Sequence, residues 1–295
     1  MRKHAYLITA YNNWDILGKQ IRLLDDERND IYLMVDRKTK DFSPEQLPEC
    51  KHAGFYLMDR IEIFWAHYSQ VQAVLNMLRK AFAEERRQRI RYTYFHLLSG
   101  VCLPIKSQDY IHSFCDNCGK ELIAVVPEDL WYSTKRVKFY YPLVGTHIYK
   151  NHKPVKALSE GLVLLQRLFR VNRLKGRNIT IYNGWDWGSF TGEFARYLVR
   201  HEREIREMFS KTLCPSELWF HTMALNSEFR GRIYDSTDLK KGSMRYIDWT
   251  RGNPYVWREE DYHTLIESPY LFARKFDEKT DRTIVDRIFE YVNQS

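Results

Sequence analysis

Short apolar runs alternate with longer amphipathic stretches along most of the chain. Short apolar runs favour buried β-strands, and apolar positions that recur every three or four residues favour helices that cover a sheet. Strands are predicted at residues 6–10, 31–35, 94–98, 122–126, 179–182 and 246–249. Helices are predicted at residues 14–24, 68–84, 192–209, 217–226, 259–267 and 281–293.

This alternation predicts the α/β class, with a central, mostly parallel, twisted sheet flanked by helices. The length of 295 residues allows one large domain or two small ones. Because the chain has no internal repeat and no linker rich in Pro, Gly or Ser, we expect a single domain over residues 1–295. Within it, residues 131–178 form a basic insertion.

Positive charge is concentrated in that insertion. The chain has 46 Lys and Arg against 38 Asp and Glu, a net charge of +8. Residues 131–178 hold 11 of the cations and one acid, Glu160, so they carry +10 and the rest of the chain carries −2. A segment of this kind suits a polyanionic partner: nucleic acid, an anionic membrane surface or an acidic glycan.

The insertion also carries apolar residues at helical spacing. They are Leu158, Leu162, Leu165 and Phe169, with Arg167, Arg170 and Arg173 among them. In one interpretation the helix packs this face on the domain and its cations face water. In the other, Leu162, Leu165 and Phe169 stay partly exposed and the helix binds an anionic membrane peripherally. Both interpretations stay open.

Cysteine content indicates a reducing compartment. The five cysteines, at positions 50, 102, 115, 118 and 214, are odd in number and irregularly spaced, which favours free thiols. Cys115 and Cys118 lack a second ligand pair at zinc spacing, so no metal site is predicted there. No apolar run approaches the ~20 residues that span a bilayer. The N-terminus shows no secretory signal pattern, and we expect a cytoplasmic protein.

Several common catalytic motifs are absent. The sequence has no G-x-G-x-x-G after the first predicted strand, no P-loop, no G-x-S-x-G elbow and no H-E-x-x-H helix. Instead, the second predicted strand ends in a single acid, Asp36, where an open α/β sheet places its ligand. A metal-dependent sugar-nucleotide enzyme would want a second carboxylate two residues later, and Lys38 stands there.

Seven segments together resemble a known family. They are AYLI at 5–8, YLMVD at 32–36, WAHYSQVQA at 65–73, FHLLSG at 95–100 followed by LPIK at 103–106, GWDWGSFT at 184–191, PSE at 215–217 and LFARKFD at 271–277. In this order they resemble the core-2/I-branching glycosyltransferases of glycosyltransferase family 14, which include the peptide O-xylosyltransferases. The resemblance covers residues 5 to about 287 and implies a GT-A type fold, a UDP-sugar donor, inversion at the anomeric carbon and no metal cofactor.

The resemblance also implies roles for individual residues. Glu217 matches the catalytic base, which takes the proton from the acceptor hydroxyl. Without a metal, fixed cations must meet the charge that develops on the diphosphate. Lys275 matches the family lysine, Arg245 or Arg251 the family arginine, and Arg274 is a further candidate.

The resemblance implies one group of residues that binds UDP and another that binds the acceptor. The UDP group consists of Asp36 with the loop residues Ala10 and Tyr11 and the strand-end residue Ser99. The acceptor group consists of Trp185, Asp186 and Trp187, since aromatic faces pack on sugar rings and carboxylates bind their hydroxyls. Asp186, between two Trp residues, is hard to explain as an apolar core position.

The expected function is transfer of a sugar, GlcNAc or xylose, to a hydroxyl of a glycan acceptor that is lipid-linked. The resemblance and the missing secretory features suggest a bacterial-type member that makes surface polysaccharide, peripheral at the inner face of the plasma membrane. The alternative is a non-catalytic protein that binds anionic glycan or nucleic acid through residues 131–178. Since no DNA- or RNA-reading motif is present, nucleic acid is not an expected partner.

Overall fold

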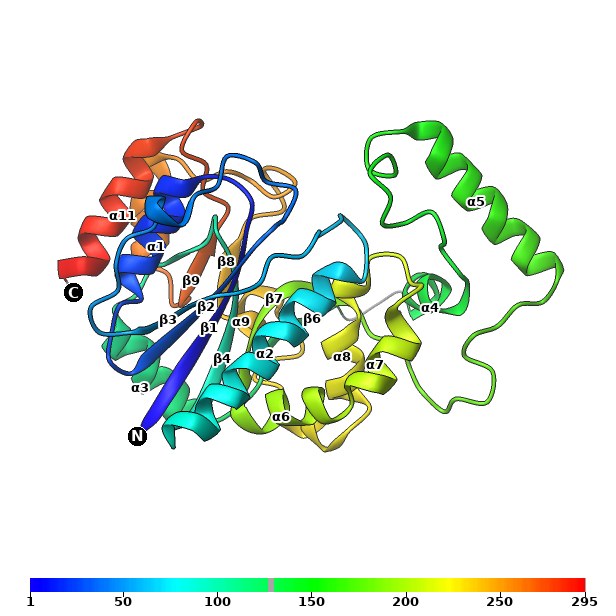
Figure 1. The fold of residues 1–295 in the computed structure, drawn as a ribbon, viewed down its shortest axis with the longest axis horizontal. Coiled ribbons are helices and arrows are strands. Elements are labelled where there is room, and N and C mark those ends of the chain that lie inside the picture. Colours follow the sequence, from blue (N-terminus) through cyan, green and yellow to red (C-terminus); the bar gives the residue numbers. More distant parts are fainter. Residues whose placement is uncertain (127–129, 295) are drawn as a thin grey trace.

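The computed structural model describes residues 1–126 and 130–294. Within them, six strands form a central sheet in the order β3-β2-β1-β4-β7-β6 (Figure 1). The strands are β1 (Arg2–Ala10), β2 (Asn29–Val35), β3 (Gly54–Leu57), β4 (Arg91–Ser99), β6 (Leu122–Val125) and β7 (Gly184–Thr191). β1 pairs in parallel with β2 and β4, and β2 with β3, whereas β7 is antiparallel to β4 and β6. The predicted mostly parallel sheet is confirmed.

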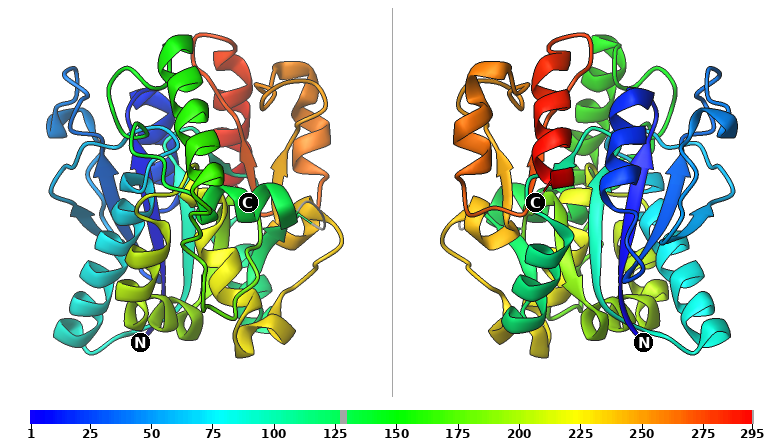
Figure 2. Two further views of the ribbon diagram at one scale, coloured as in Figure 1. Left: turned by 90° about the vertical axis from the view of Figure 1, so that its right-hand side faces the viewer. Right: turned by 90° about the vertical axis from the view of Figure 1, so that its left-hand side faces the viewer.

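Helices cover both faces of this sheet (Figure 2). Successive strand residues point to opposite faces, so Leu7 of β1 packs in one apolar cluster and Ile8 in the other. The Leu7 face is covered by α2 (Ser69–Gln88), α6 (Gly192–Arg200), α7 (Glu202–Phe209) and α8 (Trp219–Leu225). The Ile8 face is covered by α1 (Trp14–Leu23) and α3 (Gln108–Cys118), and α9 (Leu239–Ser243) packs beside β6.

A second, small sheet packs on the Ile8 face of the central sheet, where Phe272 belongs to the apolar cluster of that face. It consists of β5 (Leu103–Pro104), β9 (Phe272–Arg274) and β8 (Arg245–Ile247), in that order. Its side chains share an apolar cluster with α1, α10 (Tyr262–Ile266) and α11 (Arg282–Gln294). Since β9 carries the LFARKFD segment, this sheet places Arg274 and Lys275 at its end.

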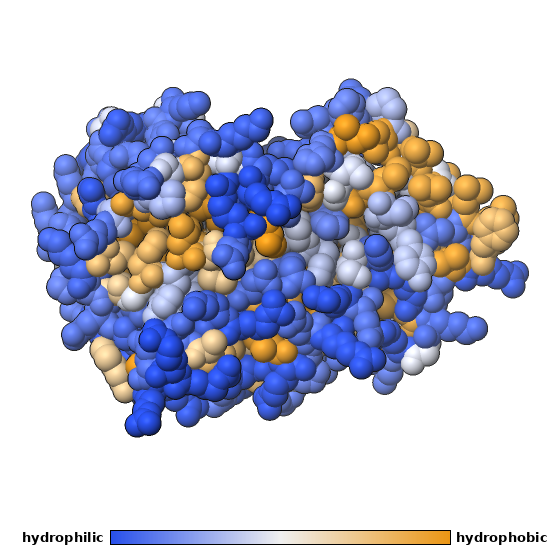
Figure 3. Space-filling model, in the orientation of Figure 1, coloured by the Kyte–Doolittle hydropathy of each residue, from blue (hydrophilic) through white to orange (hydrophobic). Residues whose placement is uncertain are grey.

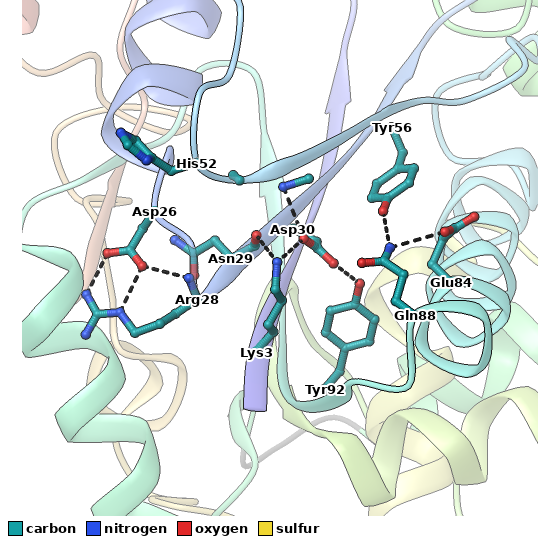
Figure 4. A network of polar contacts seen from close by, with 12 residues as sticks. Lys3, Asp26, Arg28, Asn29, Asp30, His52, Tyr56, Glu84, Gln88 and Tyr92 are labelled. Atoms are coloured by element: carbon teal, nitrogen blue, oxygen red, sulfur yellow. Dashed lines mark hydrogen bonds and ion pairs between the residues drawn. The ribbon is translucent and has the colours of Figure 1, made fainter. Parts of the chain in front are cut away.

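A buried polar network ties together the amino-terminal ends of four strands (Figure 4). Lys3 Nζ lies 2.8 Å from Asp30 Oδ1, and the Asp30 side chain is fully buried. The Tyr92 hydroxyl donates to Asp30 Oδ2, and the backbone N–H of Gly54 donates to Oδ1 at 3.1 Å. One carboxylate therefore joins β1, β2, β3 and β4, at the end of the strands opposite to Asp36.

The basic insertion contributes two helices, α4 (Leu130–Lys138) and α5 (Lys153–Leu168). α5 stands apart from the central sheet in Figure 1. The segment has its own apolar cluster of buried residues, consisting of Ala66, Phe139, Tyr141, Val144, Tyr149 and Val163. Among the described helices, none has the length and hydropathy that crossing a membrane requires.

The prediction of a strand at 179–182 was wrong. Its backbone groups bond to side chains of α8 and its C-cap instead of to a neighbouring strand: Thr180 N donates to Asn226 Oδ1 at 3.0 Å, and Tyr182 N to Thr222 Oγ1 at 3.1 Å. The strand is β7, which begins at Gly184. A Cβ on Gly184 would lie 1.9 Å from the carbonyl oxygen of Ala124 on β6, so glycine permits this close pairing.

Helix boundaries were predicted more closely than strands. The predicted helices at 14–24, 68–84 and 281–293 correspond to α1, α2 and α11. The predicted helix at 192–209 is interrupted at His201, which separates α6 from α7. The predicted helix at 217–226 is a 3₁₀ turn over Pro215–Glu217 followed by α8, and the one at 259–267 is a 3₁₀ turn over Glu259–Asp261 followed by α10.

Candidate active site

Three predicted UDP-binding residues meet at the carboxyl ends of adjacent parallel strands. Ala10 ends β1, Ser99 ends β4, and Asp36 directly follows β2. The backbone N–H of Asp36 donates to Ala10 O at 3.0 Å, and this hydrogen bond holds the ends of β2 and β1 together. A Cβ on Gly100 would lie 2.9 Å from the Ala10 Cβ. The glycine therefore lets the end of β4 lie close to the end of β1. Ligands of open α/β sheets bind at this edge.

The Asp36 carboxylate is already engaged by its neighbour. Lys38 Nζ lies 2.7 Å from Oδ2 and 2.9 Å from Oδ1, and the backbone N–H of Ile63 donates to Oδ1 at 3.3 Å. The same Lys38 ammonium lies 4.4 Å from the centre of the Phe64 ring. A carboxylate has about four acceptor sites, so Oδ2 keeps room for a ligand donor beside the ammonium. Tyr11, 61% exposed, stands at this edge after β1.

The predicted base and the predicted acceptor acid form a second group. Glu217 lies in the 3₁₀ turn Pro215–Glu217, which packs beside β7, the strand that carries Asp186. Burial, and then the negative charge of Glu217, raise the pKa of Asp186 to about 6, against the opposing effects of Ser216, Arg274 and Arg136. Asp186 Oδ1 is shielded from solvent and has no hydrogen-bond partner among the described residues. An unpartnered buried carboxylate oxygen is costly unless a ligand completes it.

Glu217 is held by an arginine from the basic insertion. Its Oε2 lies 2.7 Å from Arg136 Nη2 of α4, and the Glu217 side chain is 40% exposed while that of Arg136 is 3% exposed. The Arg136 guanidinium also donates to the carbonyl oxygens of Leu213 and Cys214, which precede the 3₁₀ turn. Arg136 therefore orients a carboxylate that solvent, and thus an acceptor hydroxyl, can reach.

Aromatic and cationic groups border these two acids. Arg274 Cζ lies 4.6 Å from the centre of the Trp187 ring, and its buried Nε has no partner among the described residues. The Trp185 and Trp249 rings lie 6.3 Å apart, so the end of β8 meets β7 here. Lys275, half-buried, follows Arg274 along the chain. The site thus offers two carboxylates, indole faces and a cation with an unused donor.

The other two candidate arginines lie in different surroundings. Arg245 is 2% exposed and donates to the carbonyl oxygens of Ser243 and Gly188 and to Ser189 Oγ. Burial lowers its pKa to about 10. Arg251 pairs with Asp248 at 2.6 Å and with Asp261 at 2.7 Å. Arg245 is enclosed in the core, although its Nε has no partner among the described residues, and Arg251 is held by two carboxylates. Among the four candidate cations, the more accessible Arg274 and Lys275 are therefore the better placed to meet a diphosphate.

One buried cluster has metal-ligand residue types and is hydrogen-bonded within the core, except that His4 Nε2 has no partner among the described residues. Ligand atoms of His4, His96 and Cys115 lie within 4.8 Å of one another. His4 Nδ1 and His96 Nε2 are hydrogen-bonded at 3.1 Å, and His96 Nδ1 bonds Ser189 Oγ, which also accepts from Arg245. The adjacent guanidinium and the burial of the rings, which lowers the pKa of both histidines, indicate a neutral core network.

Comparison with known proteins shows the family. The model of the core-2/I-branching enzyme family matches residues 4–267, nearly nine tenths of the chain. The chain belongs to the core-2/I-branching enzyme family. The resemblance is thereby confirmed at the level of the family for six of the seven segments, since LFARKFD at 271–277 lies beyond the matched residues. The match favours an enzyme over a purely binding protein.

Curated relatives of this core-2/I-branching enzyme are xylosyltransferases. Over 242 residues, 72% of the chain, it is 25% identical to Xylosyltransferase sqv-6 of Caenorhabditis elegans, of which the match covers 30%. Over 136 residues, 39% of the chain, it is 31% identical to Xylosyltransferase sqv-6 of Caenorhabditis briggsae, covering 17% of that protein. Over 124 residues, 37% of the chain, it is 27% identical to Xylosyltransferase 2 of Rattus norvegicus, covering 14%. The chain spans less than a third of the length of these relatives.

Two residues of this core-2/I-branching enzyme were missed by sequence reasoning. Arg136 is one of 11 cations in the insertion, and nothing in the sequence marks it as the one that is buried and bonded to Glu217. Trp249 was treated only as the end of a strand, although it is 46% exposed beside Trp185. Aromatic residues at the ends of predicted strands are a signal that would have identified Trp249 but not Arg136.

Proposed function

We propose that this chain is an inverting glycosyltransferase that moves a sugar from a UDP-sugar to a hydroxyl of a glycan acceptor. Family membership supports sugar transfer, and one observation supports the mechanism. Glu217 is a half-exposed carboxylate, oriented by Arg136 and placed beside Asp186 and the Trp187–Arg274 stack. A single accessible carboxylate next to sugar-binding groups is what an in-line displacement requires.

Each group of residues has its own role in the proposed reaction. Asp36, Ala10, Tyr11 and Ser99 bind the uridine, and Asp186 with Trp185 and Trp187 bind the acceptor. The acceptor oxygen forms a bond to the anomeric carbon while the bond from that carbon to the diphosphate breaks. The acceptor proton passes to Glu217, and the bonding electron pair leaves with UDP. Arg274 and Lys275 stabilise the negative charge that develops on the diphosphate.

The proposed mechanism uses no metal ion. Mg²⁺ and Mn²⁺ prefer carboxylate ligands, but Lys38 pairs with Asp36 at 2.7 Å and brings a positive charge to the place a metal would take. Two cations of the chain itself, Arg274 and Lys275, replace the metal in neutralising the diphosphate.

The donor carries GlcNAc or xylose in this proposal. The names of the relatives favour xylose, since each is a xylosyltransferase. We further propose that the enzyme works in the cytoplasm on bacterial surface polysaccharide. The five cysteines support a reducing compartment, because all of them are free thiols in the structure.

A transfer assay with a matched variant tests this function. Purified protein is incubated with a panel of UDP-sugars and oligosaccharide acceptors, and UDP release is measured with and without acceptor. We expect acceptor-dependent release for one donor, and a loss of at least ~100-fold in kcat for Glu217→Gln with unchanged UDP affinity. Glu228→Gln, at an exposed position after α8, is the control. Full activity of Glu217→Gln would exclude Glu217 as the base.

A further inference from the structure

The outer face of α5 is a row of exposed apolar side chains. The exposed fractions are 58% for Leu158, 62% for Leu164, 53% for Leu165, and 75% each for Leu168 and Phe169. Leu164 and Leu168 are four positions apart, as are Leu165 and Phe169, and Leu158 lies seven positions before Leu165, so the five residues share one broad side of the helix. In the space-filling view they account for the apolar surface over α5 (Figure 3). A patch of this kind on a folded protein marks an interaction site.

The helix does not need this face to hold its place. Its opposite side packs on the domain through Ser159 and Val163, each 1% exposed, and Val163 belongs to the cluster with Tyr141 and Tyr149. Gln166 adds two hydrogen bonds to the backbone of Tyr140. The first interpretation of the insertion, a helix that merely covers the domain, therefore accounts for only one of the two apolar faces.

Cations without carboxylate partners surround the apolar row. Lys150, Lys153, Lys156, Arg167 and Arg170 are exposed, and within residues 1–126 and 130–294 none is paired with an acid. The one acid of the insertion, Glu160, pairs with Lys135 at 3.3 Å. Arg173, expected among the surface cations, instead donates to backbone carbonyls of Val137 and Met208 and is half-buried.

We infer that α5 is an interfacial helix that docks this protein on an anionic lipid bilayer. An apolar row flanked by Lys and Arg is the pattern of helices that lie in the plane of the interface, with leucines among the acyl chains and cations at the headgroups. The surface is a convex helix whose exposed cations have no acidic partner within residues 1–126 and 130–294, and it complements a negative lipid surface. The inference concerns binding alone and holds whatever sugar the enzyme transfers.

The position of α5 connects the bilayer with the candidate active site. Lys156 Nζ lies 5.4 Å from the centre of the Trp65 ring, and Trp65 stacks on Tyr149 at 6.4 Å. Phe64, next to Trp65, contacts the Lys38 that holds Asp36. A chain of contacts through Trp65, Phe64 and Lys38 therefore links the docked helix with the carboxyl edge of the sheet, where an acceptor with a lipid anchor would enter from the membrane.

Vesicle co-sedimentation of the full chain tests the inference. The vesicles contain phosphatidylcholine alone or phosphatidylcholine with phosphatidylglycerol, at low and high salt. We expect binding only to the anionic vesicles, weakened by salt. Reversing Lys153, Arg167 and Arg170 to Glu should weaken binding on the order of 100-fold or more. Reversing three exposed lysines elsewhere, Lys40, Lys51 and Lys279, makes the same charge change and should weaken it much less.

A second variant tests the apolar row itself. Leu164, Leu168 and Phe169, all changed to Ser, should leave the fold intact because these side chains are exposed, and should abolish the binding that survives high salt. The same variant should retain transfer to a short soluble acceptor, which separates membrane docking from the proposed activity. Three outcomes would overturn the inference: no binding to anionic vesicles at low salt, equal loss in the control variant, or a stable dimer that the Ser variant dissolves.

Discussion

Glu217 and Asp186 are two carboxylates of one site in different surroundings. Glu217 is 40% exposed and bonded to Arg136, whereas Asp186 is half-buried with an unpartnered Oδ1. Burial and the charge of Glu217 raise the pKa of Asp186 to about 6. Two acids in such different surroundings can take different roles in one site. The accessible Glu217 suits proton abstraction, and Asp186 suits a hydrogen bond to an acceptor hydroxyl.

The raised pKa of Asp186 predicts a pH-dependent stability. The folded state binds a proton at Asp186 more tightly than the unfolded state, in which the pKa is near 3.9. The contribution of Asp186 to the free energy of unfolding should therefore fall as pH rises from about 4 to about 6, and then level off. The fall is at most about 3 kcal/mol, since one pKa unit corresponds to about 1.4 kcal/mol.

Denaturant unfolding at several pH values measures this effect. The difference in free energy of unfolding between the wild type and Asp186→Asn isolates the residue, because other acids titrate in both proteins. Asp116→Asn, at an exposed position on α3, is the control and should retain the wild-type decline. A wild-type-minus-variant difference that stays constant from pH 4 to pH 7 would contradict the assigned surroundings of Asp186.

Candidate site residues could be named from local sequence or from the family resemblance. Asp36 was named because it ends an apolar run, and Glu217 because the PSE segment resembles that of the family. Arg136 could not be found in this way. It lies 81 residues from Glu217 and is distinguished from the other cations of the insertion only by its burial, which is a tertiary property.

The elements that were missed include the helices α3 and α9 and the strands of mixed composition or short length. β2 is buried along its whole length, reads as a continuous apolar run and was predicted. β7 contains two glycines, two tryptophans and an aspartate, and these residues hide a strand pattern because they serve close pairing and the site. β3 is a short edge strand with three half-buried residues and the exposed Leu57, so little hydrophobic signal marks it.

The polar network at the amino ends of the strands predicts a large cost for removing one carboxylate. Asp30→Asn leaves Lys3, whose side chain is 10% exposed, without its partner, and weakens the bonds from Tyr92 and Gly54. Breaking a buried ion pair costs about 3–5 kcal/mol in the free energy of unfolding. We expect a loss in this range by urea denaturation, with unchanged UDP affinity in the folded fraction, because the network lies opposite the site.

An exposed ion pair provides the matched control. Asp109, with 84% of its side chain exposed, pairs with Arg28 at 2.7 Å. Asp109→Asn should change the free energy of unfolding by less than about 1 kcal/mol. If Asp30→Asn were as mild as this control, the ion pair between Lys3 and Asp30 would contribute no more to stability than an exposed pair.

For the whole molecule, the sheet edges and the insertion act together. The central sheet supplies Asp36 after β2 and Asp186 on β7. The small sheet supplies Arg274 and Lys275, and the insertion supplies Arg136. No single unit carries the site, so the order of segments along the chain predicted the family but not the contacts between them. Those contacts depend on how the insertion and the small sheet pack against the central one.

This arrangement predicts that the folded protein binds UDP without a metal ion. A ligand that binds only the folded state stabilises it, by ≈ 2.7 kcal/mol at a concentration of 100 times Kd. UDP should therefore raise the melting temperature, and EDTA should not remove the effect, because Lys38 occupies the side of Asp36 where a metal would bind. Lys275→Ala should reduce the UDP-dependent rise, whereas Arg203→Ala, with a side chain 93% exposed on α7, should not. Loss of the rise on chelation, with recovery on adding Mn²⁺, would show that a metal and not these cations neutralises the diphosphate.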